Sequence, residues 1–185
     1  MSLLPEHSPE ITFPTAEDAD DMLRLRARLY TEELITSGLP EEAAKRHTAD
    51  WTLPESLEEY REVVEDWTTD STIFLRTVHV KTQESSQLKG IFLGERPTFY
   101  RPIHFVRLVQ LDDSIRRRGV GRRLFEEMAS VDPTAPMELN VLQGNEPAKK
   151  FYRALGFTAV AQGAFTIAER RVPMDRMRRP ASALS

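Results

Sequence analysis

A short turn rich in arginine and glycine holds the residues of this 185-residue chain that are best suited to chemistry. The eight residues from Arg116 to Arg123 read RRRGVGRR. Glycine allows a tight turn to take a positive φ or to approach a ligand closely, and the first N–H groups of a helix that follows point outward unpaired. The helix dipole and the guanidinium groups add positive charge at the same place. These residues predict a site for an anionic, phosphate-bearing ligand.

A strand before the turn and a helix after it would hold it in place. From Ile103 to Leu111 the residues are mostly large and apolar with little alternation, which is typical of a strand buried on both faces. After the turn, apolar residues follow helical spacing at Val120, Leu124, Phe125 and Met128. The segment lacks the Lys-Ser/Thr ending of a P-loop and the third glycine of the dinucleotide fingerprint, which argues against both of those sites. A nucleic-acid-binding patch and a plain solvated basic face stay open as alternatives.

The turn resembles the pyrophosphate loop of the GNAT superfamily, the CoA-dependent N-acyltransferases, whose pattern is Gln/Arg-x-x-Gly-x-Gly/Ala. Arg116, Gly119 and Gly121 match that pattern, although Asp113 stands where the family commonly has proline. A second segment resembles the family element Asn-x-x-Ala-x-x-x-Tyr-x-x-x-Gly-Phe. Its matching residues are Asn145, Ala148, Tyr152, Gly156 and Phe157. Both motifs occur in the family's order, and each follows a predicted strand.

The resemblance implies the GNAT fold, of the α/β (α+β) class, over nearly the whole chain. This is a central twisted sheet, mixed but mostly antiparallel, of about seven strands flanked by about four helices, in the order β-α-α-β-β-β-α-β-α-β-β. The predicted strands are residues 11–13, 72–80, 88–95, 103–111, 137–142, 157–162 and 165–174, with the last two hinged near Gly163. Helices are expected at 15–35, 56–67, from 120 onward and at 146–155, with a further short one within 43–50. We expect a single domain over 11–175 and mobile tails at 1–10 and 176–185.

Composition narrows the choice of partners. A net charge of −4 gives the surface as a whole no attraction for nucleic acid, so the arginine turn is expected to bind a small anion and no nucleic acid. The chain has no cysteine, which excludes disulfides, thiolate metal sites and a cysteine nucleophile. The scattered His7, His47 and His79 have no ligand spacing, so no metal is expected. Without a membrane-spanning apolar run or a leader, we expect no membrane partner and a cytoplasmic location.

The resemblance implies that acetyl-CoA is the donor substrate. In the family, a bulge in the strand before the turn splays it from the next strand, and pantetheine lies in the gap, where a backbone N–H binds the thioester oxygen. The turn would bind pyrophosphate chiefly through backbone N–H groups, and Gly119 and Gly121 would leave the approach unblocked. The implied contacts with acetyl-CoA are Leu108, Val109, Gln110, Leu111, Arg116, Arg117, Arg118, Gly119, Val120, Gly121, Arg122, Asn145, Ala148 and Tyr152.

Transfer of an acyl group from a thioester to an amine needs a polarised carbonyl, a neutral amine and a proton for the departing thiolate. The resemblance assigns Tyr152 as the general acid; the alternative is a tyrosine on the core side of its helix. An alkylammonium has a pKa of about 10.4, so a base or a water chain must first take its proton. His104 and Glu95 are the main candidates for this base, and Glu138 and Asn140 are weaker ones.

The sequence thus predicts an N-acetyltransferase that moves an acetyl group from acetyl-CoA to a primary amine, on a small molecule or a peptide, by direct attack in a ternary complex. One alternative is a non-catalytic acyl-CoA-binding protein of the same fold, and a more distant one is a nucleic-acid-binding module. The sequence does not identify the acceptor, because the segments expected to determine acceptor specificity, residues 39–59 and the final strands, carry no motif. Acidic residues within 41–66 would favour a cationic amine if they line the site, or would form a solvated helix face. The final strands are also available for pairing in a homodimer.

Overall fold

A single seven-stranded sheet organises the protein in a computed structural model that describes residues 8–82 and 85–181. Its strand order is β1-β2-β3-β4-β5-β7-β6. The strands are β1 (Pro9–Thr12), β2 (Ile73–Lys81), β3 (Ser86–Glu95), β4 (His104–Leu111), β5 (Met137–Leu142), β6 (Thr158–Ile167) and β7 (Arg170–Arg179). Neighbouring strands pair antiparallel except β4 and β5, which are parallel. The predicted mixed, mostly antiparallel sheet is confirmed.

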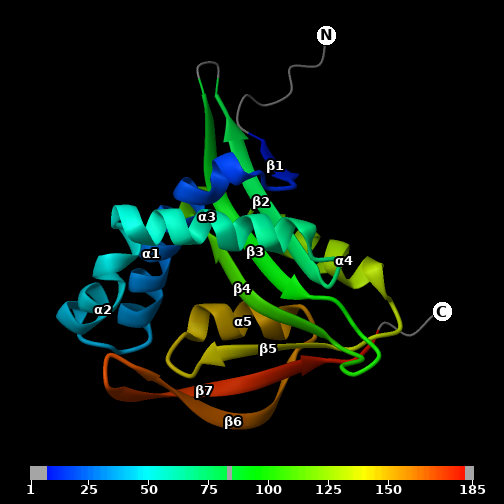
Figure 1. The fold of residues 1–185 in the computed structure, drawn as a ribbon. Coiled ribbons are helices and arrows are strands. Elements are labelled where there is room, and N and C mark those ends of the chain that lie inside the picture. The colour runs from blue at the N-terminus through cyan, green and yellow to red at the C-terminus, as the bar shows by residue number, and fades with distance from the viewer. Residues whose placement is uncertain (1–7, 83–84, 182–185) are drawn as a thin grey trace.

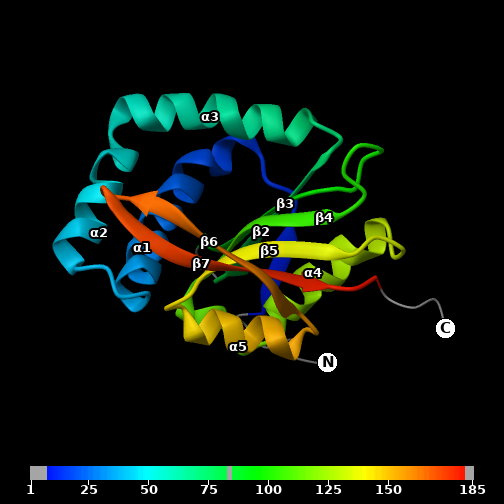
Figure 2. The same ribbon diagram turned by 90° about the horizontal axis from the view of Figure 1, so that it is seen from below.

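Helices cover both faces of this sheet, with α3 on one side and α4 and α5 on the other (Figures 1 and 2). The α-helices are α1 (Ala19–Thr36), α2 (Glu41–Thr48), α3 (Pro54–Thr69), α4 (Val120–Val131) and α5 (Glu146–Ala154). The predicted order has two helices before the second strand, whereas the structure has three. The additional element is α2, which lies where a further short helix was expected within 43–50, while Pro54 occupies the first position of α3, where proline is favoured.

The sheet divides the apolar core into two main clusters. On the face of α4 and α5, Phe125 packs its ring against those of Phe92, Phe151, Tyr152 and Phe157. On the other face, α1 and α3 pack on β2 and β3 through a second buried cluster: Met22, Leu25, Leu57, Val64, Leu75, Ile91 and Leu93. Because Phe125 lies in α4, this packing fixes the start of α4 against the sheet and therefore the turn that precedes it.

The β6–β7 hairpin differs from the prediction of a hinge near Gly163. The turn lies instead at Ala168 and Glu169, both of which have positive φ (47° and 63°). Gly163 lies within β6, where an added Cβ would come within 2.8 Å of Met174 Cε. The glycine therefore marks a close approach of side chains inside the hairpin and not its turn.

The predicted tails are also shorter than expected. β1 begins at Pro9 and β7 continues to Arg179, so 176–179 belong to the sheet. Three segments lie outside the described residues: 1–7 and 182–185 of the predicted tails, and 83–84, between the predicted strands 72–80 and 88–95. Within the part of the chain that the structure describes, no helix is both long enough and apolar enough to cross a membrane.

Candidate functional site

β4 and β5 separate in the middle of the sheet. They pair at only three positions, the last of which joins Val106 to Leu139. Immediately after Val106, the register between β3 and β4 skips Arg107, so β4 carries one extra residue there. An extra residue bends a strand and increases its twist. The bulge implied by the resemblance is therefore present, and it opens the only parallel pair among the described strands.

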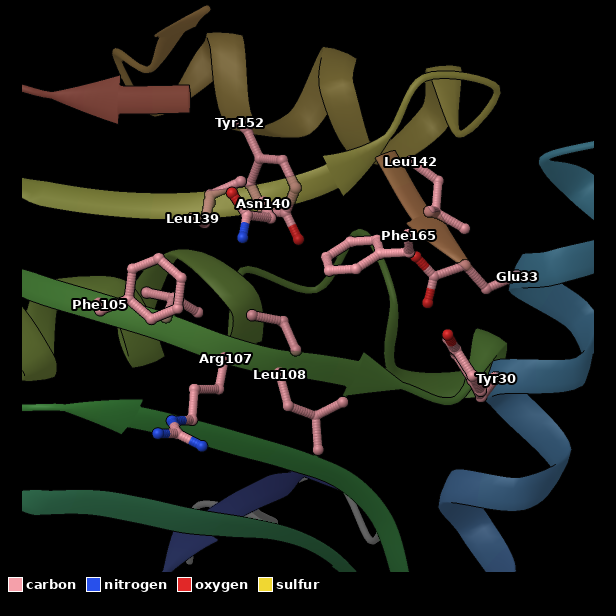
Figure 3. A pocket seen from close by; sticks show the side chains of 12 residues that line it. Tyr30, Glu33, Phe105, Arg107, Leu108, Leu139, Asn140, Leu142, Tyr152 and Phe165 are labelled. Atoms are coloured by element: carbon pink, nitrogen blue, oxygen red, sulfur yellow. The ribbon is translucent and has the colours of Figure 1, made fainter. Parts of the chain in front are cut away.

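A cleft of about 380 Å³ fills the gap between the two strands (Figure 3). Of the residues predicted to contact acetyl-CoA, Leu108, Val109 and Tyr152 line it. Asn140, weighed as a weaker catalytic candidate, lines it as well. The other lining residues come from α1, β4, β5 and β6 and were not singled out from the sequence: Tyr30, Glu33, Phe105, Val106, Arg107, Leu139, Leu142 and Phe165.

Tyr152 reaches the cleft from α5, and Figure 3 shows its hydroxyl turned into the opening. Only 9% of the residue is exposed, and its ring packs against those of Phe125 and Phe157. Burial raises the pKa of Tyr152, and the nearby Glu33 carboxylate raises it further. The phenol therefore keeps its proton at neutral pH and can donate a hydrogen bond into the cleft.

Glu33 reaches the same cleft from α1, at one end of the opening (Figure 3). The Asn145 side-chain amide donates to its Oε1 at 3.2 Å. Burial raises the pKa of the Glu33 carboxyl, while the Asn145 hydrogen bond and the charge of Arg116 act in the lowering direction. A carboxylate with a raised pKa is a better proton acceptor than an ordinary one. The sequence contains one indication that Glu33 faces the cleft. Tyr30 and Glu33 are three residues apart, so they share a face of α1, and both line the cleft.

His104, predicted as a candidate base, lies outside the cleft. Its ring is fully buried, and Nε2 is 2.9 Å from the carbonyl oxygen of Asp132, just after α4. Burial lowers the pKa of His104. The residues of β4 that line the cleft run from Phe105 to Val109, and His104, which precedes them, is not among them. The structure therefore does not bring His104 together with Tyr152.

The two glutamates weighed as bases are both engaged by arginine side chains. Glu95 accepts hydrogen bonds from Arg101 and Arg107, which engage both of its carboxylate oxygens. Glu138 lies 3.6 Å from Arg178 in an ion pair. Neither glutamate lines the cleft. Their carboxylates are thus arranged to fix arginine side chains, and Glu33 is the carboxylate that the fold brings to the opening.

The arginine turn lies at the end of β4 and leads directly into α4. Arg117 and Gly119 both have positive φ (59° and 79°), and a positive φ is uncommon for a residue other than glycine. From Arg117 to Gly121, no backbone N–H donates to an acceptor among the described residues. Successive free N–H groups at a helix start form a concave anion-binding surface. The geometry therefore fits a phosphate group at this turn.

Arg116 is engaged within the protein. Its Nε donates to the Leu111 carbonyl oxygen at 2.7 Å, and Nη1 is 2.5 Å from Asp113. The exposed Arg117 and Arg118 make no ion pair with other described residues. Arg116 thus fastens the turn to the end of β4, while the next two guanidinium groups are free to meet an anion.

Gly121 differs from its predicted role of leaving room for the ligand. It is buried, and an added Cβ would lie 2.8 Å from Phe151 Cζ and 3.5 Å from Leu111 Cδ1. Gly119, in contrast, has open space around the position of a Cβ. Gly121 therefore allows α4 to pack closely on α5, whereas Gly119 supplies the backbone conformation of the turn.

Gly121→Ala should therefore lower the free energy of unfolding by about 1 kcal/mol, because overpacking costs more than alanine gains in helix propensity. Chemical denaturation would measure this. Adding Phe151→Leu should recover part of the loss, since the shorter side chain leaves room for the new methyl group. Equal stability of Gly121→Ala and wild type would contradict the packing role.

The remaining predicted contacts outside the turn do not line the cleft. Gln110 is buried, and its Oε1 has no hydrogen-bond partner among the described residues. Ala148 packs against the apolar cluster on the α4 and α5 face of the sheet. Asn145 caps α5, because its Oδ1 accepts from the Ala148 N–H at 3.2 Å. The described part of the chain contains no group of three or more acidic or histidine side chains arranged to hold a metal ion. None of the acidic residues of 41–66 lines the cleft.

Comparisons with known proteins agree with this architecture. Residues 98–166 match the model of the family described as FR47-like protein. An uncharacterized protein of Mycobacterium leprae is 35% identical over 68 residues, which are 37% of this chain and 18% of that protein. The chain therefore matches less than a fifth of the length of this curated relative.

Solved structures match over almost the whole chain. The PaiA N-acetyltransferase of Thermoplasma acidophilum, in complex with coenzyme A, aligns with a TM-score of 0.64 and 15% identity over 91% of this chain and 98% of its own. The ribosomal-protein-S5-alanine acetyltransferase of Vibrio fischeri aligns with a TM-score of 0.67 and 14% identity over 96% and 95%. At these identities the likeness is one of fold.

Proposed function

We propose that the protein is an acetyl-CoA-dependent N-acetyltransferase of the GNAT superfamily that acts on a primary amine; the match of residues 98–166 to the FR47-like family and the fold shared with solved acetyltransferases support this proposal. The observation that carries the proposal is the position of the cleft. It begins at the bulge of β4, the strand that leads to the turn with unpaired N–H groups, and it is lined by both Tyr152 and Glu33. One strand, β4, thus connects the anion-binding turn with a cleft that contains two groups able to transfer protons.

In this proposal the donor lies along β4. The pyrophosphate accepts hydrogen bonds from the backbone between Arg117 and Gly121, and the pantetheine arm follows Leu108 and Val109 into the cleft. An N–H of β4 that the divergence from β5 leaves unpaired would meet the thioester oxygen as it gains negative charge. Donors fixed in the fold need no reorganisation during the reaction, which is why such groups stabilise a transition state effectively.

The acceptor reaches the same point from the side of Glu33. Glu33 takes a proton from the ammonium group, and the neutral nitrogen attacks the thioester carbon. The carbon–sulfur bond then breaks, and Tyr152 donates its proton to the departing sulfur. The phenolate regains a proton released from the nitrogen as the amide forms, so the protons balance within one ternary complex. The raised pKa of Glu33 makes it a better base, and the raised pKa of Tyr152 keeps the phenol protonated until the thiolate forms.

The test is direct observation of transfer. The purified protein is incubated with acetyl-CoA and a panel of primary amines, and free CoA thiol and acetylated product are both measured. Formation of both in equal amounts supports the proposal. Tight acetyl-CoA binding with no product from any amine would instead favour a non-catalytic acyl-CoA-binding protein.

Arg118→Glu should weaken acetyl-CoA binding by about tenfold at low salt, because it replaces an attractive exposed charge with a repulsive one. The effect should shrink as salt rises, since exposed charges are screened. Calorimetric titration of both variants at two salt concentrations would measure it. Arg24→Glu makes the same charge change at an exposed position on α1 and serves as the control. Equal losses in both variants would contradict a specific role of the turn.

A further inference from the structure

One face of the sheet beside the cleft carries more arginine than glutamate. On the side of the sheet that carries α3, none of the described helices lies over β5, β7 or β6 (Figure 1). We call this region the open face. It is defined by Phe105, Arg107, Glu138, Asn140, Arg176 and Arg178, with the adjoining Glu95 and Arg101. The four arginines exceed the two glutamates, so an anionic group is favoured near this face.

Most arginines of the open face have an acidic partner. Arg101 and Arg107 share Glu95, and Arg178 pairs with Glu138 at 3.6 Å. Arg176 is exposed and forms neither an ion pair nor a hydrogen bond with another residue that the structure describes. Its guanidinium is therefore the one on the open face that has no counter-charge among the described residues.

The sheet register places Arg176 at the edge of the cleft. It lies opposite Asn140 in the β5–β7 ladder. The Cβ atoms of such a pair are roughly 5 Å apart and lie on the same face, and Asn140 lines the cleft. Ala161, the partner of Arg176 on β6, is too small to cover it. The guanidinium can therefore reach a group on a molecule that enters the cleft from the open face.

Asn140 supplies a second polar group between Arg176 and the reacting centre. Figure 3 shows its amide in the cleft beside the Tyr152 hydroxyl. Its Oδ1 is buried and has no hydrogen-bond partner among the described residues. A buried polar atom without a partner costs free energy, and an N–H group of a bound molecule would remove that cost.

We propose that the acceptor carries a carboxylate as well as its amine, and that Arg176 binds the carboxylate. This inference rests on the proposed function and names the chemical class of its acceptor. The amine points toward Glu33, Asn140 accepts a hydrogen bond from an N–H of the acceptor, and the carboxylate pairs with the planar guanidinium through two parallel hydrogen bonds. The matching molecules are amino acids, and short peptides with an acidic group near the N-terminus.

The experiment compares each carboxylate acceptor with its own carboxamide. Free amino acids and dipeptides with an acidic second residue form two arms, each assayed against the matched amide at saturating acetyl-CoA. We expect kcat/KM to be at least about tenfold higher for the carboxylate in one of these arms, since a hydrogen-bonded charge pair is lost in the amide. Arg176→Gln should abolish that preference by raising KM for the carboxylate, with kcat/KM for the carboxamide unchanged.

Arg178→Gln is the matched control, because it removes an arginine of the same strand that already has a partner. It should keep the preference. Equal use of carboxylate and carboxamide in both arms, or an equal loss for both in Arg176→Gln, would overturn the inference. Calorimetric binding of the same compounds in the presence of CoA provides a readout without turnover. Carboxylate binding that depends on Arg176 but gives no product would contradict the proposed enzyme while supporting this site, and no carboxylate binding would overturn the site itself.

Discussion

Tyr152→Phe is expected to lower kcat by about a hundredfold or more, the usual contribution of a positioned general acid. The substitution removes only the hydroxyl, which faces the cleft and makes no hydrogen bond with another described residue. The ring, which packs against Phe125 and Phe157, is kept. Acetyl-CoA affinity and thermal stability should therefore change little. Steady-state kinetics beside calorimetric titration would measure both.

Tyr30→Phe provides the matched control, because Tyr30 is the other tyrosine that lines the cleft. Loss of its hydroxyl should leave kcat within a few-fold of wild type. Should Tyr152→Phe retain full kcat, proton donation by Tyr152 would be ruled out, and water would be the proton source. A single-turnover experiment would also show whether the chemical step is the one slowed.

Glu33→Gln should reduce kcat/KM by about a hundredfold at neutral pH, because the amide cannot take a proton from the ammonium group. Burial raises the pKa of Glu33, so wild-type activity should fall as the pH drops through a midpoint above the usual range of a glutamate. The variant should lose that dependence. A pH profile of kcat/KM for both proteins would measure the effect.

The same variant should be more stable than the wild type at neutral pH. Because the pKa of Glu33 is raised on folding, the folded state binds this proton more tightly than the unfolded chain, and stability falls as pH rises between the two pKa values. The destabilisation by the buried Glu33 carboxylate is fully present above the pKa of the folded state and absent below the pKa of the unfolded state. Glutamine does not titrate and so avoids this destabilisation, while its Oε1 can still accept the hydrogen bond from Asn145. The gain in Tm should therefore vanish at acidic pH.

Glu32→Gln is the control for both measurements. Glu32 precedes Glu33 on α1 but is half-exposed and pairs with Arg28 at the surface. Surface pairs contribute little, so neither activity nor Tm should change appreciably. A loss of activity in Glu33→Gln together with a lower Tm at neutral pH would indicate a structural role and would contradict the assignment as base.

The sequence alone determined the elements that face the core and the turn between them. Val120, Leu124 and Phe125 predict α4 because apolar residues at helical spacing must be buried together. Asn145 and Gly156 bound α5 for local reasons, a side-chain cap and a positive φ of 88°. Such signals depend on residues close in the chain, which is why the strand–turn–helix and the order of motifs could be predicted.

Only the tertiary structure decided which side chains meet at the site. Glu33 and Tyr152 are 119 positions apart in the sequence, and they line the same cleft because α1 lies at one end of the gap between β4 and β5, which begins at the bulge at Arg107. His104 lies before that gap, where β4 still pairs with β5 at Met137, and no composition signal reveals where this pairing ends. From the sequence, Gly121 was expected to leave room for a ligand and Gly163 to mark a turn, yet each faces a side chain from another element. Contacts of this kind depend on how distant elements pack, and the sequence pattern of one element does not contain that information.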